Sequence, residues 1–316
     1  MEIYVTWILA LILTLILTIF FTVLFTKIKG NLFEDVRGGI PRAIGIAPFI
    51  AMVIFFPKPF SYLIGLMGIL AFIDDLLGRK KIGSLPIDVG QLLRGIGIIA
   101  VMVLGYYCMG PIAILVALMV QIMNIADMQP GTVCTTVFIM SIISFAILTL
   151  LGSPLYYLPI LLIFICLGYA SQDYSGYIMM GEVGNHSFGI ALGIILAIVS
   201  AVITKGITTT MFYPVEFIVM IILFLITTII IAYLRKRTLK NYLEQYLNIQ
   251  NPVFGDYVMD VLTGGGLGDL FRKIIFQNKQ YRTNNDILIL LGARRFLFNP
   301  FAQQYQEHKV FTQHKL

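Results

Sequence analysis

The chain is dominated by apolar runs that are long enough to cross a lipid bilayer. Hydrophobic residues make up 59% of its 316 residues, and charged residues make up only 12%. A helix needs about 20 apolar residues to span the hydrocarbon core. We expect such spans at about 3–26, 44–56, 60–77, 95–109, 111–126, 133–152, 154–170, 187–204 and 214–234. The sequence therefore predicts an all-α polytopic membrane protein with about nine transmembrane helices.

The basic residues predict how these helices are oriented. With the N-terminus outside, every Lys and Arg except Lys58 and Lys205 falls on the inner side. Because Lys and Arg favour cytoplasmic loops, we expect a multi-pass cell-membrane protein with its polar loops in the cytoplasm. Residues 1–234 would form a transmembrane catalytic domain, and residues 235–316 a basic cytoplasmic or interfacial tail that completes the site. The bilayer and lipid phosphates are the expected partners, nucleic acid is not, and a homodimer is a candidate assembly.

The polar segments between the predicted spans all fall on this inner side. They are residues 27–43, the pair Asp74-Asp75, residues 124–131 and residues 171–186. A transporter is expected to hold charged residues near the membrane midplane. An enzyme that works at one interface would collect them on one face. The pattern favours the enzyme.

The pair Asp74-Asp75 ends an apolar run and is the strongest chemical signal. Adjacent carboxylates repel each other unless a cation compensates them, and oxygen ligands beside phosphate chemistry favour Mg²⁺. The alternative is an interfacial pair that only stops a helix. Which of the two would act as a base stays open, because coupled carboxylates titrate together.

Three further segments carry candidate residues. Arg37 and Arg42 lie among glycines and suit phosphate contact, although ordinary inner positive charge explains these two residues better when they are taken alone. Asn124 and Asp127 are three residues apart and share a face on a continuing helix, or form part of a loop. Glu182 is flanked by glycines that let backbone amides approach a phosphate. Together with the aspartate pair, these residues suit phosphoryl transfer with Mg²⁺.

Four motifs occur in order along the chain: GGIPRAIG at 38–45, AFIDDL at 71–76, NIADMQPG at 124–131 and MGEVGNHSFGIALG at 180–193. Together they resemble the polyprenyl-phosphate N-acetylhexosamine-1-phosphate transferases, which include phospho-MurNAc-pentapeptide translocase and the GlcNAc-1-phosphate transferases. The resemblance implies an Mg²⁺-dependent transfer of a sugar 1-phosphate, N-acetylhexosamine in type and in some members peptide-bearing. The donor would be a UDP-sugar, the acceptor a polyprenyl phosphate such as an undecaprenyl or dolichyl phosphate, and the released product UMP.

The resemblance also implies roles for individual residues. Asp74, Asp75 and Asp127 would be catalytic, and Glu182 with Asp75 would bind Mg²⁺. The expected substrate contacts are Asn124, Arg37, Arg42, Gln172, Asn185, Gln303 and Gln304.

The chain departs from the family pattern at several positions. Glu182 stands in place of a metal-binding aspartate, and Pro130 stands where phospho-MurNAc-pentapeptide translocase has a further aspartate. Ala302-Gln303-Gln304 replaces its run of three histidines. These departures indicate a divergent branch. They also motivate an alternative function, a non-catalytic homologue that binds polyprenyl phosphate as a scaffold in glycan assembly.

Overall fold

The computed structural model describes residues 3–34, 39–78, 88–208 and 210–302. The chain divides into two compact units, Met1–Thr227 and Thr228–Leu316. The boundary between the two units lies inside the helix α9. Within the described residues the fold is all-α, apart from two strands of two residues each.

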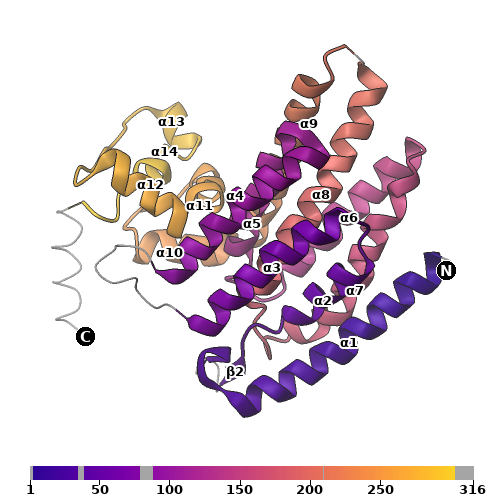
Figure 1. Ribbon diagram of the computed structural model, residues 1–316. Helices are drawn as coiled ribbons and strands as arrows, with labels where there is room; N and C mark the ends of the chain where they lie inside the picture. Colours follow the sequence, from indigo (N-terminus) through magenta and orange to yellow (C-terminus); the bar gives the residue numbers. More distant parts are fainter. Residues whose placement is uncertain (1–2, 35–38, 79–87, 209, 303–316) are drawn as a thin grey trace. The chain divides into compact units, whose positions relative to one another are not determined.

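The first unit holds the long apolar helices (Figure 1). Its elements are α1 (Ile3–Ile28), β1 (Phe33–Glu34), β2 (Ile40–Pro41), α2 (Ile46–Phe55), α3 (Phe60–Leu77), α4 (Val89–Met109), α5 (Ala113–Ala126), α6 (Thr132–Leu150), α7 (Tyr157–Tyr174), α8 (Gly181–Ile207) and most of α9 (Phe212–Leu234). β1 and β2 pair antiparallel, with Phe33 opposite Pro41.

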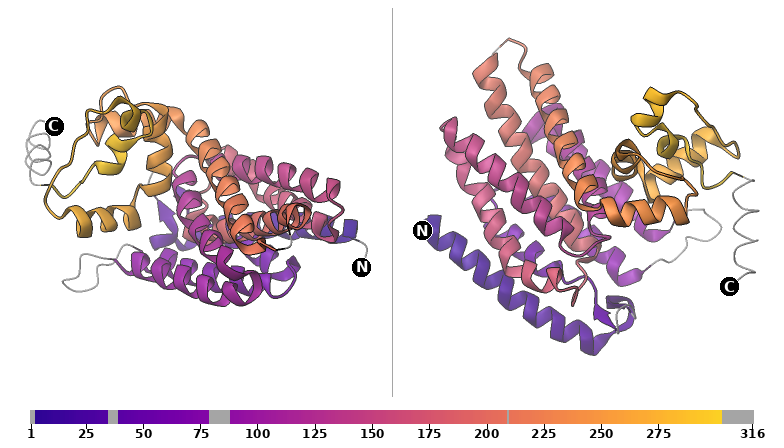
Figure 2. Two further views of the ribbon diagram at one scale, coloured as in Figure 1. Left: turned by 90° about the horizontal axis from the view of Figure 1, so that it is seen from above. Right: turned by 180° about the vertical axis from the view of Figure 1, so that it is seen from behind.

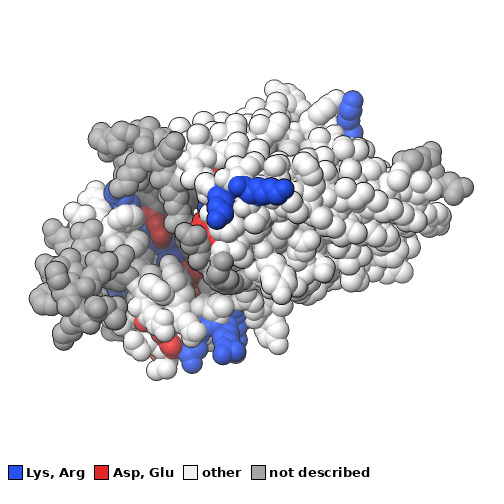
Figure 3. Space-filling view, turned by 90° about the horizontal axis from the view of Figure 1, so that it is seen from below, with Lys and Arg blue, Asp and Glu red and all other residues white. Residues whose placement is uncertain are grey.

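The prediction of a polytopic helical membrane protein is confirmed, but the expected nine spans divide differently. Among the described residues, seven helical segments are long and apolar enough to cross a membrane. One of them, Val89–Ala126, contains both α4 and α5, which the short 3₁₀ turn Gly110–Ile112 connects. α2 has only 10 residues and is too short to span alone. Most of the surface seen in Figure 3 carries neither acidic nor basic side chains, as an apolar environment requires.

α8 is the central helix of the first unit. It packs against α3 and α5, whereas α1 lies at the edge beside α2 and α7 (Figure 2). Gly189 and Gly193 allow the close approach to α5, since a Cβ atom at either position would lie 3.1 Å from a backbone Cα atom of that helix. Small residues spaced four apart are a common means of packing membrane helices closely.

The chain folds so that several helix ends meet at the N-terminus of α8. The segment after β2 is pinned to the residues that precede α8 by three backbone hydrogen bonds. Met179 N donates to Pro41 O at 2.9 Å, Ile44 N donates to Met179 O at 3.1 Å, and Gly45 N donates to Met180 O at 2.9 Å. The ends of α3 and α5 and the start of α4 reach the same place through side chains described below.

The second unit consists of short helices that follow the end of α9. They are α10 (Lys236–Gln245), α11 (Phe254–Thr263), α12 (Gly266–Phe276), α13 (Asp286–Leu290) and α14 (Ala293–Leu297). α11 packs against α10, α13 and α14. α11 and α12 are separated at Gly264-Gly265.

Candidate functional site

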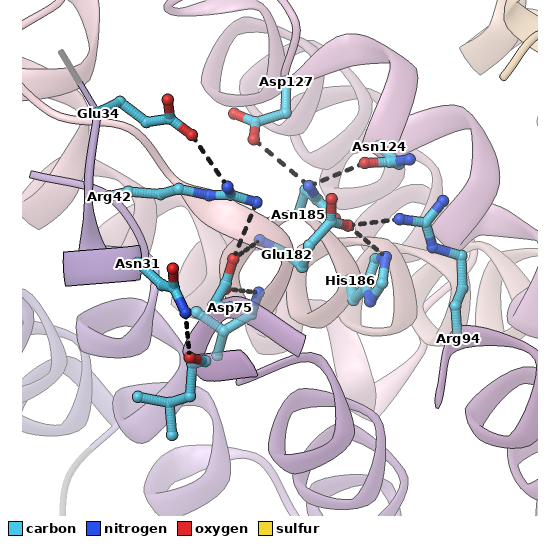
Figure 4. A network of polar contacts seen from close by, with 12 residues as sticks. Asn31, Glu34, Arg42, Asp75, Arg94, Asn124, Asp127, Glu182, Asn185 and His186 are labelled. Carbon is cyan, nitrogen blue, oxygen red and sulfur yellow. Dashed lines mark hydrogen bonds and ion pairs between the residues drawn. The ribbon is translucent and has the colours of Figure 1, made fainter. Parts of the chain in front are cut away.

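The carboxylate of Asp75 sits on the N-terminus of α8 and is only 1% exposed. Its Oδ1 accepts a hydrogen bond from the backbone N–H of Glu182 at 3.1 Å, and its Oδ2 accepts one from Val183 at 2.9 Å. The first amides of a helix lack partners within it and carry partial positive charge, so they stabilise an anion. Arg42 approaches the same carboxylate, with Nη2 3.4 Å from Oδ1 (Figure 4).

Glycines make this arrangement possible. A Cβ atom on Gly45 would lie 2.3 Å from the Cα of Gly184, so the two backbones approach too closely for side chains. Gly181 has a φ of 73°, and a Cβ atom there would lie 2.9 Å from Asp75 Oδ2. The glycines of two sequence motifs therefore serve one close contact between segments.

Glu182 lies at the centre of a second group of charges. Its Oε2 is 2.8 Å from Nη2 of Arg94 and 3.1 Å from Nε2 of His186 (Figure 4). Arg94 comes from the first turns of α4, and His186 lies one turn along α8 from Glu182. Arg94 is buried, and a charge removed from water needs a partner of this kind.

An amide and carboxylate cluster adjoins Glu182. Asn185 Nδ2 donates to Asn124 Oδ1 at 3.2 Å and lies 3.4 Å from Asp127 Oδ2. If the Asn124 amide is turned over, its nitrogen lies 3.2 Å from Glu182 Oε2 and its oxygen 2.8 Å from Arg94 Nη1. Asn124 therefore links the two groups.

The surroundings of Asp127 favour its neutral form, whereas those of Arg42 favour its charged form, as their pKa shifts show. Burial, reinforced by the negative charge of Asp173, raises the pKa of Asp127 well above its ordinary value. Burial lowers the pKa of Arg42, but the charges of Asp75 and Glu182 outweigh this effect and raise it overall. Asp127 is therefore readily protonated, whereas Arg42 remains charged.

Asp74 differs from its neighbour Asp75. Its side chain packs against the backbone of α4 at Gly90. A side chain at that position would collide with it, since a Cβ atom on Gly90 would lie 2.1 Å from Asp74 Oδ1. Within the described part of the chain, the Asp74 carboxylate accepts no hydrogen bond. Of the aspartate pair, Asp75 is held by the fold and Asp74 is free to take a proton.

The structure brings together most of the residues predicted from sequence. Those that meet around the N-terminus of α8 are Arg42, Asp75, Asn124, Asp127, Glu182 and Asn185 (Figure 4). Gln172 does not join them, since its side chain contacts Thr22 of α1 at 3.1 Å. Arg37, Gln303 and Gln304 lie outside the described residues.

Sequence reasoning missed three contributors. Arg94 was counted only as inner positive charge, although an arginine inside an apolar helix calls for a buried carboxylate partner. Glu34 pairs with Arg42 at 3.1 Å. Asp173 accepts hydrogen bonds from Gly131 N at 3.0 Å and from Cys134 Sγ at 3.3 Å, and so holds the turn after Asp127. No sequence pattern marked the last two.

The carboxylates predicted to bind Mg²⁺ do not form a ligand set in this arrangement. Asp75 faces backbone amides and Arg42, and Glu182 faces Arg94 and His186. Among the described residues, no group of three or more His, Cys, Asp or Glu side chains is placed to hold a metal ion. These carboxylates instead fix the positions of two arginines.

No protein-family model matches this chain, and no curated protein matches it.

Proposed function

We propose that this protein transfers a sugar 1-phosphate from a UDP-sugar to a polyprenyl phosphate at the cytoplasmic face of the membrane. The observation that carries the proposal is the seating of Asp75 on the amides of Glu182 and Val183. This contact joins segments more than 100 residues apart, and it gathers two arginines, several carboxylates and two asparagine amides at one end of an apolar helix bundle. Such a site suits a reaction between phosphates at a membrane surface.

In the proposed reaction an oxygen of the lipid phosphate attacks the β-phosphorus of the UDP-sugar. A new P–O–P bond forms, the bond from the β-phosphorus to the bridging oxygen breaks, and UMP leaves with that oxygen. Asp74, the free carboxylate, accepts the proton of the lipid phosphate. Arg42 and Arg94 are the described cations that can contact phosphate oxygens, and guanidinium groups do so bidentately.

The asparagine cluster suits recognition of the donor. Asn124 and Asn185 offer amide donors and acceptors, and a protonated Asp127 can also donate. Sugar hydroxyl, acetamido and uracil groups need partners of both kinds. An N-acetylhexosamine donor, with or without a peptide, is therefore the expected class.

Mg²⁺ stays a prediction from the family resemblance. Acidic side chains outnumber arginines in this cluster. The cluster holds two arginines, Arg42 and Arg94, and five acidic residues, which are Glu34, Asp74, Asp75, Asp127 and Glu182. This surplus disfavours phosphate binding unless protons or a cation compensate it. When bound, Mg²⁺ would neutralise diphosphate charge. Comparing the transfer rate in Mg²⁺ with that in a chelator tests the requirement.

The proposal is tested by following UMP release. The full chain, reconstituted in lipid, is given a polyprenyl phosphate and a panel of UDP-sugars that includes peptide-bearing ones. UMP released with one donor, and lost in Asp74→Asn, supports the proposal. Gly95→Ala is the matched control, because a Cβ atom there meets no atom within 4 Å and the change leaves the site intact.

A non-catalytic scaffold that binds polyprenyl phosphate is the second candidate. It is favoured by the carboxylates of Asp75 and Glu182, whose oxygens contact donors within the protein. This candidate predicts saturable binding of the lipid phosphate and no UMP with any donor.

A further inference from the structure

The helix α12 of the second unit exposes a face of large apolar side chains, which a helix of a soluble domain would bury. Its exposed face carries Phe271, Ile274 and Ile275, which are 55%, 68% and 52% exposed. These residues are spaced three and four apart and so share one face. The next residue after Phe271, Arg272, points into the unit instead: it is buried and donates to Thr263 O at 2.6 Å and to Phe296 O at 3.1 Å.

The interior of the second unit is correspondingly rich in ion pairs. Arg295 Nε lies 2.5 Å from Asp260 Oδ1, and both side chains are buried. Arg272 pairs with Asp269 at 3.0 Å. A third pair, between Arg294 and Asp256, measures 2.6 Å. These pairs lie in an interior that also buries apolar side chains such as Leu243, Tyr257 and Val261, whereas α12 leaves its large apolar side chains exposed. An exposed apolar face of this kind marks a binding surface.

Chain continuity indicates what covers this face. The second unit begins within α9, a helix long and apolar enough to span the membrane, and α10 starts two residues after α9 ends. The unit is therefore tethered at the membrane surface. The exposed Lys279 and Arg282, which follow α12, add positive charge, which is complementary to anionic lipid headgroups.

We propose that α12 docks on the membrane leaflet from which α9 emerges. Phe271, Ile274 and Ile275 enter the boundary between headgroups and acyl chains, and Lys279 and Arg282 contact anionic headgroups. The buried pairs Arg272–Asp269 and Arg295–Asp260 hold the helix in the orientation that presents its apolar face. This inference does not depend on the proposed enzymatic function.

The test measures how deeply α12 sits in the full chain. Ile274→Cys is labelled with an environment-sensitive fluorophore in a Cys108→Ser background, because Cys108 is the exposed one of the three cysteines. The protein is reconstituted in vesicles that contain anionic lipid and lipids brominated along the acyl chain. Asn284→Cys, at an exposed polar position outside α12, is the matched control.

Docking predicts that brominated lipids quench the label at Ile274 at least threefold more than the label at Asn284. The difference should shrink when anionic lipid is omitted or when Lys279 and Arg282 are changed to Gln. Equal quenching at the two positions would overturn the proposal. A label at Ile274 that is shielded from aqueous iodide but not quenched by brominated lipid would also overturn it, and would assign the face to a protein partner or a second copy of the chain.

Discussion

Arg94 Nη2 lies 2.8 Å from Glu182 Oε2, and this ion pair joins the start of α4 to the first turn of α8. Both side chains are largely shielded from water, and His186 adds a second nitrogen to the same oxygen. The carboxylate that the sequence marked as a metal ligand is thus the partner of an arginine. That relationship decides how variants at either position should behave.

Removing Arg94 alone should lower the stability of the protein at least as much as removing Arg94 and Glu182 together. Arg94→Ala leaves Glu182 with His186 alone and should cost about 3–5 kcal/mol, because an unpaired charge stays buried. The double variant with Glu182→Ala should be no less stable than Arg94→Ala, since the two residues act as a unit. Thermal unfolding of the reconstituted variants measures this. Additive losses of Tm would contradict the pairing.

Substitutions of the two adjacent aspartates should differ in their effects on the transfer rate and on stability. Asp74→Asn loses no described hydrogen bond, so its Tm should match that of the unmodified protein while transfer falls roughly 10²–10⁴-fold. Asp75→Asn puts an amide group against backbone N–H donors and should cost about 1–3 kcal/mol. Parallel Tm and UMP-release measurements distinguish them. A stable, inactive Asp75→Asn beside an active Asp74→Asn would make Asp75 the base.

The close contact between Gly45 and Gly184 should not tolerate a side chain. Gly45→Ala places a Cβ atom 2.3 Å from the Cα of Gly184, so the segment before α2 must move away from α8. We expect a lower Tm and loss of transfer. The control Gly95→Ala adds a methyl group in open space within α4 and should gain about 0.5–1 kcal/mol from reduced backbone entropy. Equal Tm values and equal transfer rates for Gly45→Ala and Gly95→Ala would contradict the close contact between Gly45 and Gly184.

Asp127 should make stability depend on pH. Its folded-state pKa lies well above the ordinary value of 3.8, so between these two values the folded chain binds a proton that the unfolded chain has lost. Stability therefore falls as pH rises through this window and stays lower above it. Asp127→Asn should raise Tm at neutral pH, and the gain should vanish near pH 4. A difference in Tm that is constant with pH would contradict this account.

The sequence predicted the membrane helices because their apolar runs are long and carry almost no charge. It also predicted that Arg42, Asp75, Asn124, Asp127 and Glu182 would share one side, since a charge can leave the bilayer only at a helix end.

The sequence could not predict which charged residues pair with each other. The pairing of Arg94 with Glu182 joins residues 88 positions apart and depends on how α4 and α8 are packed. The turn between α4 and α5 falls where the sequence separated the spans 95–109 and 111–126, whereas α2 has only 10 residues where a span over 44–56 was expected.

The most direct test of the central claim uses a UDP-sugar labelled at the β-phosphorus. The reconstituted chain is given this donor and a polyprenyl phosphate, and the lipid and aqueous products are separated. Transfer of a sugar 1-phosphate predicts that the label moves into the lipid together with the sugar, in equal amounts with UMP. Sugar in the lipid with the label left in UDP would contradict the account, and so would no transfer at all despite saturable binding of the lipid phosphate.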